Sequence, residues 1–352
     1  SCMRIDAPAL RAYSPEWFFR EVEMILIIGA GAVGTTLGSY LSVAGQSVRM
    51  LVRDAEHYRQ ATQLVVEGTP GKASLVVPRP EITSSLDLSD VTYVFICVKH
   101  AALTQVLEQL PVPLPADVTL VSTLNGVSAL AQMRSRYPDA SLANMTIMFN
   151  AQLLGPLHTR MMSYPQVIID TQDPKLATLF QGSAMQVKQT QGLANAWGKL
   201  LINLSNAICA ITHSTMMALI SQPDLKRIYV AALDEAVSLL KHAGIDYHFP
   251  MPLPYQLYRQ LLLNGGSLAW RLAKLKNGLE EGSYPSMVID VAAGRLTEVE
   301  QINGELETLA RAHHLPTPIN DQLISLVRSF AGQSPPPYLS PAELLAKLGL
   351  KR

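Results

Sequence analysis

The sequence predicts an α/β domain followed by an all-helical domain. An apolar run at residues 25–28 leads directly into a glycine-rich turn and a helix-forming segment. Strand-like and helix-like segments then alternate to about residue 190, which is typical of a sheet covered by helices. From residue 194 the apolar residues recur only with helical spacing. The chain has 352 residues, more than one hydrophobic core usually supports, so two domains are expected.

The first strand is followed by the pattern Gly-x-Gly-x-x-Gly. Its residues are Gly29, Ala30, Gly31, Ala32, Val33 and Gly34. In such a turn the first glycine permits the tight bend, the second lets backbone amides approach a pyrophosphate, and the third lets the helix pack on the strand. A helix at 35–44 and a second strand at 47–52 complete a β-α-β unit. The pattern predicts a Rossmann-type dinucleotide site, with a purely structural turn as the alternative.

The second strand ends at Arg53, where NAD-binding proteins normally carry an acidic residue for the ribose 2′-hydroxyl. An arginine there can pair with a 2′-phosphate, so Arg53 favours NADP(H) over NAD. The alternative is an exposed arginine at a strand end, beside Asp54.

Two further strands end in polar residues. The buried run 93–98 is followed by Lys99, and the strand at 118–124 by Asn125 and Gly126. Open α/β sheets bind ligands at the carboxyl ends of their strands, so Lys99 is expected near the cofactor. Asn125 belongs either to an ordinary Asn-Gly turn or to the binding site. Short β-rich pieces at 64–77, a helix at 129–137 and extended segments at 144–154 and 167–170 continue the domain.

The second half contains six expected helices, at residues 197–212, 225–243, 254–276, 285–293, 298–313 and 320–330. In the first of them Lys199, Asn203 and Asn206 fall within about 40° of one helix face. Such a polar stripe needs either solvent or a ligand. A partly buried lysine has a pKa that shifts readily, which suits proton transfer.

Two shorter patterns follow. Ser286 opens a helix that Gly294 can end, and residues 297–300 have capping-box spacing, which places Glu298 in a first helical turn. No histidine pair has metal-ligand spacing with a supporting carboxylate, so no metal is expected.

Composition limits the possible partners. The 28 basic residues balance the 28 acidic ones without a basic run, which argues against nucleic acid and anionic membranes. No apolar stretch reaches the ~20 residues of a membrane span, and Cys2, Cys97 and Cys209 form no Cys-x-x-Cys pattern. A cytoplasmic protein is expected. Its expected organisation is an N-terminal extension (1–23), a dinucleotide-binding domain (24–190), a helical substrate and dimerisation domain (191–330) and a proline-rich tail (331–352).

The order and spacing of these motifs over about residues 24–330 resemble the ketopantoate reductase (2-dehydropantoate 2-reductase) family. The motifs concerned are Gly29–Gly34, Val98-Lys99, Asn125-Gly126, Trp197-Gly-Lys199-Leu-Leu-Ile-Asn203, Ser286-Met287…Asp290, Gly294-Arg-Leu-Thr-Glu298 and Ile302-Asn303-Gly304. The resemblance implies NADPH-dependent reduction of 2-dehydropantoate to (R)-pantoate, a step towards pantothenate and coenzyme A. It also implies an active site between the two domains, and a homodimer.

The same resemblance implies a role for each matching residue. Arg53 binds the 2′-phosphate, Lys99 and Asn125 lie near cofactor and substrate, and Lys199 is the catalytic acid. Asn203 and Ser286 contact the substrate, and the Glu298 carboxylate is coupled to the cofactor or to the lysine. A positioned ammonium stabilises the alkoxide that forms from a 2-keto acid and supplies its proton.

The chain departs from the family pattern at two positions, and its stretch 249–282, which borders the predicted cleft, is longer than usual for the family. Ala207 stands where the family has a second asparagine on the lysine helix, and Asn206, about 20° from Lys199, is its expected substitute. Ser283 stands where the family commonly has an asparagine that holds the pantoate group. The alternatives are therefore an oxidoreductase of the same type that acts on a different 2-keto or 2-hydroxy acid, or a non-catalytic NADP-sensing protein.

Overall fold

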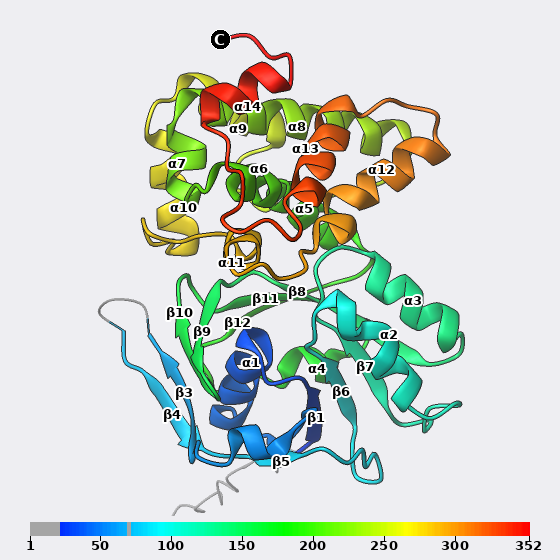
Figure 1. The fold of residues 1–352 in the computed structure, drawn as a ribbon. Helices are drawn as coiled ribbons and strands as arrows, with labels where there is room; N and C mark the ends of the chain where they lie inside the picture. Colours follow the sequence, from blue (N-terminus) through cyan, green and yellow to red (C-terminus); the bar gives the residue numbers. More distant parts are fainter. Residues whose placement is uncertain (1–21, 69–71) are drawn as a thin grey trace, which may run out of the picture.

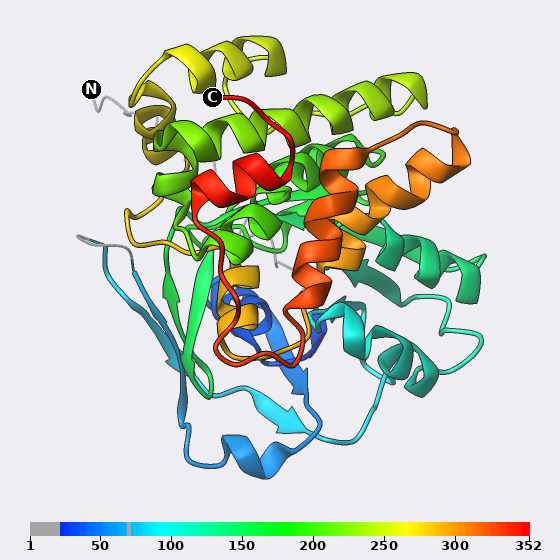
Figure 2. The ribbon, with the colours of Figure 1, turned by 45° about the horizontal axis from the view of Figure 1, so that its top comes forward.

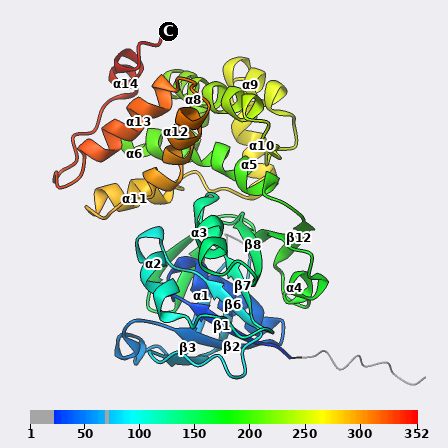
Figure 3. The same cartoon turned by 90° about the vertical axis from the view of Figure 1, so that its right-hand side faces the viewer.

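The computed structural model describes residues 22–68 and 72–352, so most of the expected N-terminal extension lies outside the described residues. Figure 1 shows a sheet domain below a layer of helices. The predicted fold class, an α/β domain followed by an all-helical domain, is confirmed for the described residues. Figure 3, from the side, shows the chain crossing from the last strand of the sheet domain into the helical layer.

The larger sheet has eight strands in the order β12-β11-β8-β7-β6-β1-β2-β5. Neighbours pair in parallel except β8 and β11, which run antiparallel. The strands are β1 (Met24–Ile28), β2 (Ser47–Leu51), β5 (Glu81–Thr83), β6 (Tyr93–Ile96), β7 (Thr119–Ser122), β8 (Ser141–Ile147), β11 (Gln166–Asp170) and β12 (Gln186–Thr190). The carboxyl ends of the central strands β1, β6 and β7 therefore lie at one edge of the sheet, where ligands bind in this architecture.

Helices cover both faces of this sheet, and the central strands are apolar on both sides for that reason. Ile25 and Ile27 face the core under α1, whereas Leu26 and Ile28 face the core under α2 and α3. The helices of this domain are α1 (Ala32–Val43), α2 (His100–Gln109), α3 (Ser128–Arg136) and α4 (Pro174–Thr178), with a 3₁₀ turn η1 (Ala55–Tyr58).

A second, four-stranded sheet was not expected as such from the sequence. Its order is β4-β3-β10-β9, from β3 (Gln63–Glu67), β4 (Leu75–Pro78), β9 (Ala151–Gly155) and β10 (His158–Met161). This sheet packs on α1, where the hydroxyls of Thr36 and Thr159 lie 3.2 Å apart. The pairing of β3 with β10 joins segments about ninety residues apart, which local sequence patterns do not reveal.

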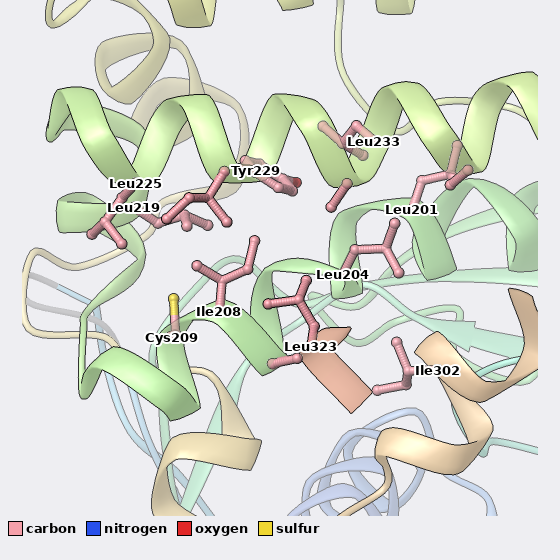
Figure 4. Close-up of a cluster of buried hydrophobic side chains, with 14 of the residues drawn as sticks. Leu201, Leu204, Ile208, Cys209, Leu219, Leu225, Tyr229, Leu233, Ile302 and Leu323 are labelled. Carbon is pink, nitrogen blue, oxygen red and sulfur yellow. The ribbon is translucent and has the colours of Figure 1, made fainter. Parts of the chain in front are cut away.

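The helical domain is built around α8, which packs on several of the other helices. Its elements are α5 (Ala194–Asn203), α6 (Ser205–Thr212), α7 (Met216–Ser221), α8 (Pro223–His242), α9 (Tyr255–Asn264), α10 (Leu268–Asn277), α11 (Ser286–Ala292), η2 (Val299–Gln301), α12 (Asn303–Ala312), α13 (Pro318–Ser329) and α14 (Pro341–Lys347). Figure 4 shows Ile208 of α6 and Tyr229 of α8 in the core of this domain, both buried. None of the described helices is long and apolar enough to cross a membrane.

Three expected helices are divided in the structure. The segment 197–212 bends at Leu204, which keeps helical dihedral angles. The segment 254–276 is interrupted at Gly265 and Gly266, and the left-handed Gly266 (φ 57°) cannot continue a helix. The expected helix at 298–313 begins only at Asn303, so the interpretation of Glu298 as a first-turn residue is wrong. Glu298 instead precedes the 3₁₀ turn η2.

The proline-rich segment after α13 crosses the helical domain and ends in α14, as Figure 2 shows in red. The Leu339 amide donates to the Ile211 carbonyl, and Ser340 and Glu343 form a capping box at the start of α14. Leu344 and Leu345 are buried, and α14 packs on α8. This segment is thus part of the helical domain's core.

Candidate active site

A cavity of about 390 Å³ lies between the two domains. The sheet domain lines it with the glycine turn and with residues at the carboxyl ends of β6, β7 and β8. The helical domain lines it with α5, α6, α11 and the start of α7. The cavity therefore occupies the sheet edge at which the sequence predicts ligand binding.

The glycine turn has the geometry of a dinucleotide cradle. A Cβ on Gly29 (φ 102°) would lie 2.6 Å from the Cys97 carbonyl oxygen, and one on Gly34 would lie 2.0 Å from the Gly29 carbonyl oxygen. At Gly31, by contrast, nothing lies within 4 Å of the Cβ position, and this residue lines the cavity with Ala32 and Val33. The turn is thus closed where strand and helix meet and open where a pyrophosphate could approach the start of α1.

Gly29, Ala30 and Gly34 do not line the cavity but shape the turn behind it. Arg53 also lies outside the lining, exposed just beyond β2, and it makes no hydrogen bond or ion pair with the described residues. Its neighbour Asp54 accepts a hydrogen bond from the Glu56 amide. On the same strand Arg49 is held by Glu81 and Asp90, so its guanidinium is occupied.

Lys199 is the central cation of the cavity. Its Nζ donates to Asn125 Oδ1 at 2.9 Å, which joins the helical domain to the loop after β7. Burial lowers the pKa of Lys199 to about 8, against the opposing effect of the Glu298 carboxylate. Asn203 Nδ2 lies 3.5 Å from the same Asn125 oxygen. Asn125 is thus a contact of the predicted site and more than an ordinary turn residue.

The other predicted residues of α5, α6 and α11 also reach the cavity. Asn206 lines it and is 7% exposed, and its side chain makes no hydrogen bond within the described part of the chain. Ser286 lines the cavity as the first residue of α11. The bend at Leu204 therefore does not separate the polar stripe that starts at Lys199.

Lys99 joins the two domains through an ion pair that was not predicted. Its Nζ donates to Asp290 Oδ1 at 2.7 Å, and Arg295 Nε donates to the same oxygen at 3.0 Å. The Asp290 side chain is buried, whereas both cations are about half exposed. Asp290 follows Ser286 by one helical turn on α11. This helical spacing was the sequence signal that could have placed Asp290 on the same side of the helix as Ser286.

His100 is a second residue that sequence reasoning missed. Its Nε2 lies 2.7 Å from the Asn125 carbonyl oxygen and 3.7 Å from Glu298 Oε2, and its backbone amide donates to that carboxylate at 3.4 Å. The imidazole is buried. The available signal was its position directly after Lys99 at a strand end that faces the ligand site.

Together, a glycine turn at the sheet edge and a desolvated lysine on the opposite domain define the architecture of a two-domain oxidoreductase. Comparison with known families shows which family of oxidoreductases this is. The family model described as "Ketopantoate reductase PanE/ApbA" matches residues 25–173, and its C-terminal counterpart matches residues 193–331. The chain belongs to the ketopantoate reductase family.

Relatives and solved structures agree with this assignment. The chain is 23% identical to a 2-dehydropantoate 2-reductase of Halobacterium salinarum (86% of this chain, 97% of the relative) and 25% identical to one of Mycobacterium tuberculosis (86% and 96%). The fold is similar to the ketopantoate reductase structure from Ralstonia eutropha (TM-score 0.71, 23% identity, 87% and 98% covered). It is also similar to D-mandelate dehydrogenase with NADH and anilino(oxo)acetate (TM-score 0.72, 21% identity, 93% and 100% covered).

Proposed function

We propose that this chain reduces a 2-oxo acid to the corresponding 2-hydroxy acid with NADP(H). The observation that carries the proposal is the Lys199 ammonium, held by Asn125 in the same cavity that the glycine turn lines. A reduced nicotinamide bound there would supply the hydride. We assign proton donation, charge stabilisation and substrate binding to the chain's own residues.

Lys199 serves as the proton donor in this proposal. Its pKa of about 8 leaves it protonated at neutral pH and close enough to that pH to release the proton easily. The positive charge also stabilises negative charge that develops on the carbonyl oxygen. The carboxamides of Asn203 and Asn206 and the hydroxyl of Ser286 are the groups we assign to substrate binding, because all three line the cavity.

We assign the preference for NADP(H) over NAD(H) to Arg53. Its guanidinium has no protein partner in the described residues, and it follows the strand whose end normally meets the adenosine ribose. We also propose a homodimer, as is stated for the dimeric ketopantoate reductase of Staphylococcus aureus.

The test is NADPH oxidation by purified protein with a panel of 2-oxo acids that includes 2-dehydropantoate, the substrate named for the relatives. The Lys199→Ala variant is expected to lose on the order of 10²-fold or more in kcat while its affinity for NADPH stays within about twofold. Lys347→Ala, on the exposed end of α14, is the matched control and should retain full turnover. Equal turnover in Lys199→Ala and the control would refute the role of Lys199.

A further inference from the structure

The cavity is lined by two kinds of surface. The polar groups around Lys199 come from the loop after β7 and from α5, α6 and α11. Apolar side chains line the same cavity from the segment after β8, the start of α7 and two loops of the helical domain, and we call them the apolar wall. The residues of this apolar wall are Met148, Phe149, Met216, Met251 and Leu279.

Ala207 and Ser283 stand at the two positions where the family commonly has asparagine. Neither of them offers a polar group to this wall. Ala207 is fully buried and lies outside the lining. Ser283 is also outside the lining, and its hydroxyl accepts a hydrogen bond from Asn150 Nδ2 at 2.8 Å. The Ser283 carbonyl accepts from the Met216 amide at 3.1 Å. The Ser283 hydroxyl is therefore bonded within the protein and does not form part of the cavity lining.

The polar residues that line the cavity with the apolar wall differ in how far they are bonded within the protein. Asn150 donates its backbone amide to Ser163 Oγ at 2.7 Å and its side-chain amide to Ser283. Asn277 gives its carbonyl to the Tyr164 amide, and its half-buried carboxamide makes no hydrogen bond with the described residues. Asn206 also lacks a partner, but it lies on the Lys199 side of the helix, where the substrate's carboxylate and carbonyl must bind.

We propose that the preferred substrate is a 2-oxo acid whose side chain is bulky and apolar, branched or aromatic, and carries no hydroxyl group. This inference rests on the proposed function and specifies the substrate class of the same site. An apolar side chain would bury the wall of Met148, Phe149, Met216, Met251 and Leu279 without leaving a hydroxyl unpaired, which is unfavourable in such a place. The three flexible methionine side chains allow this wall to adapt to side chains of different shape.

The sharpest test compares two acids that differ by one hydroxyl group: 3,3-dimethyl-2-oxobutanoate and 2-dehydropantoate. An apolar pocket discriminates against an added hydroxyl by about 10- to 100-fold, whereas a site built to bind that hydroxyl rejects the acid without it by about 10⁴-fold or more. We expect kcat/KM with NADPH to be about 10- to 100-fold higher for 3,3-dimethyl-2-oxobutanoate. Equal values, or a higher value for 2-dehydropantoate, would overturn the inference while leaving the proposed function intact. A folded protein that reduces none of the acids would contradict the proposed function itself.

A variant pair shows whether the apolar wall causes the preference. Met251→Asn places an amide on this wall and is expected to shift the ratio about tenfold towards 2-dehydropantoate. Met216→Asn tests the same point from α7, should Met251→Asn not fold. Leu153→Asn, on the exposed strand β9, is the control and should leave the ratio unchanged. An unchanged ratio in a folded wall variant would overturn the inference. Loss of 2-dehydropantoate turnover specifically in Asn277→Ala would also overturn it, because that result would assign the substrate hydroxyl to Asn277.

Discussion

At the scale of single residues, the burial of Lys199 makes its positive charge unfavourable, so its pKa is lowered. Burial lowers its pKa from the ordinary value of 10.5 to about 8, and the Glu298 carboxylate limits the shift. The site is thereby supplied with an acid that is charged at neutral pH, yet close to its own titration point.

This shift predicts a pH dependence with a definite sign. The proposed reduction needs the protonated amine, so kcat/KM for the 2-oxo acid should be constant below about pH 8 and fall about tenfold per unit above it. Oxidation of the 2-hydroxy acid needs the neutral amine and should rise over the same range. Initial rates in both directions between pH 6 and 10 check this. A reduction rate that stays constant up to pH 10 would contradict the role of Lys199.

Arg53 predicts cofactor preference. In the proposed cofactor site, Arg53→Ala removes a charge-assisted contact to the 2′-phosphate. Such a contact is worth about 1.5–3 kcal/mol, so the variant should raise KM for NADPH about 10- to 100-fold while KM for NADH changes little. Arg59→Ala is the matched control, because Arg59 is exposed nearby and pairs only loosely with Glu56, at 3.5 Å. Loss of NADPH affinity in both variants would mean a general effect of surface charge.

Much of the cavity lining could be predicted from the sequence, because strand ends and helix faces are local properties. The stripe of Lys199, Asn203 and Asn206 lines one cavity, as the helical spacing indicated. His100 and Asp290 were missed because their significance depends on partners 25 and 191 residues away. Only the apposition of the two domains brings such pairs together.

At the scale of elements, α5 is held in place by close backbone contact as well as by apolar packing. The His248 amide donates to the Ala194 carbonyl at 2.8 Å, so the segment before α9 lies directly on α5. Gly198, beside Lys199, makes this approach possible, because a Cβ there would lie 1.7 Å from the His248 carbonyl oxygen. The glycine before the lysine thus has a packing role.

Gly198→Ala is therefore expected to destabilise the protein by about 1–3 kcal/mol or more, since α5 and the segment at His248 must separate. The free energy of unfolding in urea measures the loss. Gly155→Ala is the control, because nothing lies within 4 Å of its Cβ position. Equal stability of the two variants would show that the contact at His248 is not close in solution.

The elements themselves were predicted unevenly, for physical reasons. Central strands such as β6 are short apolar runs buried on both faces, and their sequence shows it. The bend at Leu204 leaves no residue signature, because its dihedral angles stay helical. The four-stranded sheet depends on the pairing of β3 with the distant β10.

At the scale of the whole molecule, both domains line the cavity, and contacts between them hold its two sides together. Lys99 with Asp290, His100 with Glu298 and Asn125 with Lys199 each join the edge of the sheet domain to the helical domain. A Cβ on Gly126 would lie 2.5 Å from the Gln301 carbonyl oxygen, so the loop after β7 also packs directly on η2. Neither domain alone contains both the glycine turn and the lysine.

The central claim is that a hydride passes to a 2-oxo acid in this cavity. Its most direct test uses NADPH carrying deuterium at the transferred position of the nicotinamide C4, with 3,3-dimethyl-2-oxobutanoate as acceptor and mass spectrometry of the product. The account predicts a 2-hydroxy acid with one deuterium at C2, formed by the native protein and at least about 100-fold more slowly by Lys199→Ala. A native, folded protein that yields no deuterated hydroxy acid from any 2-oxo acid would contradict it.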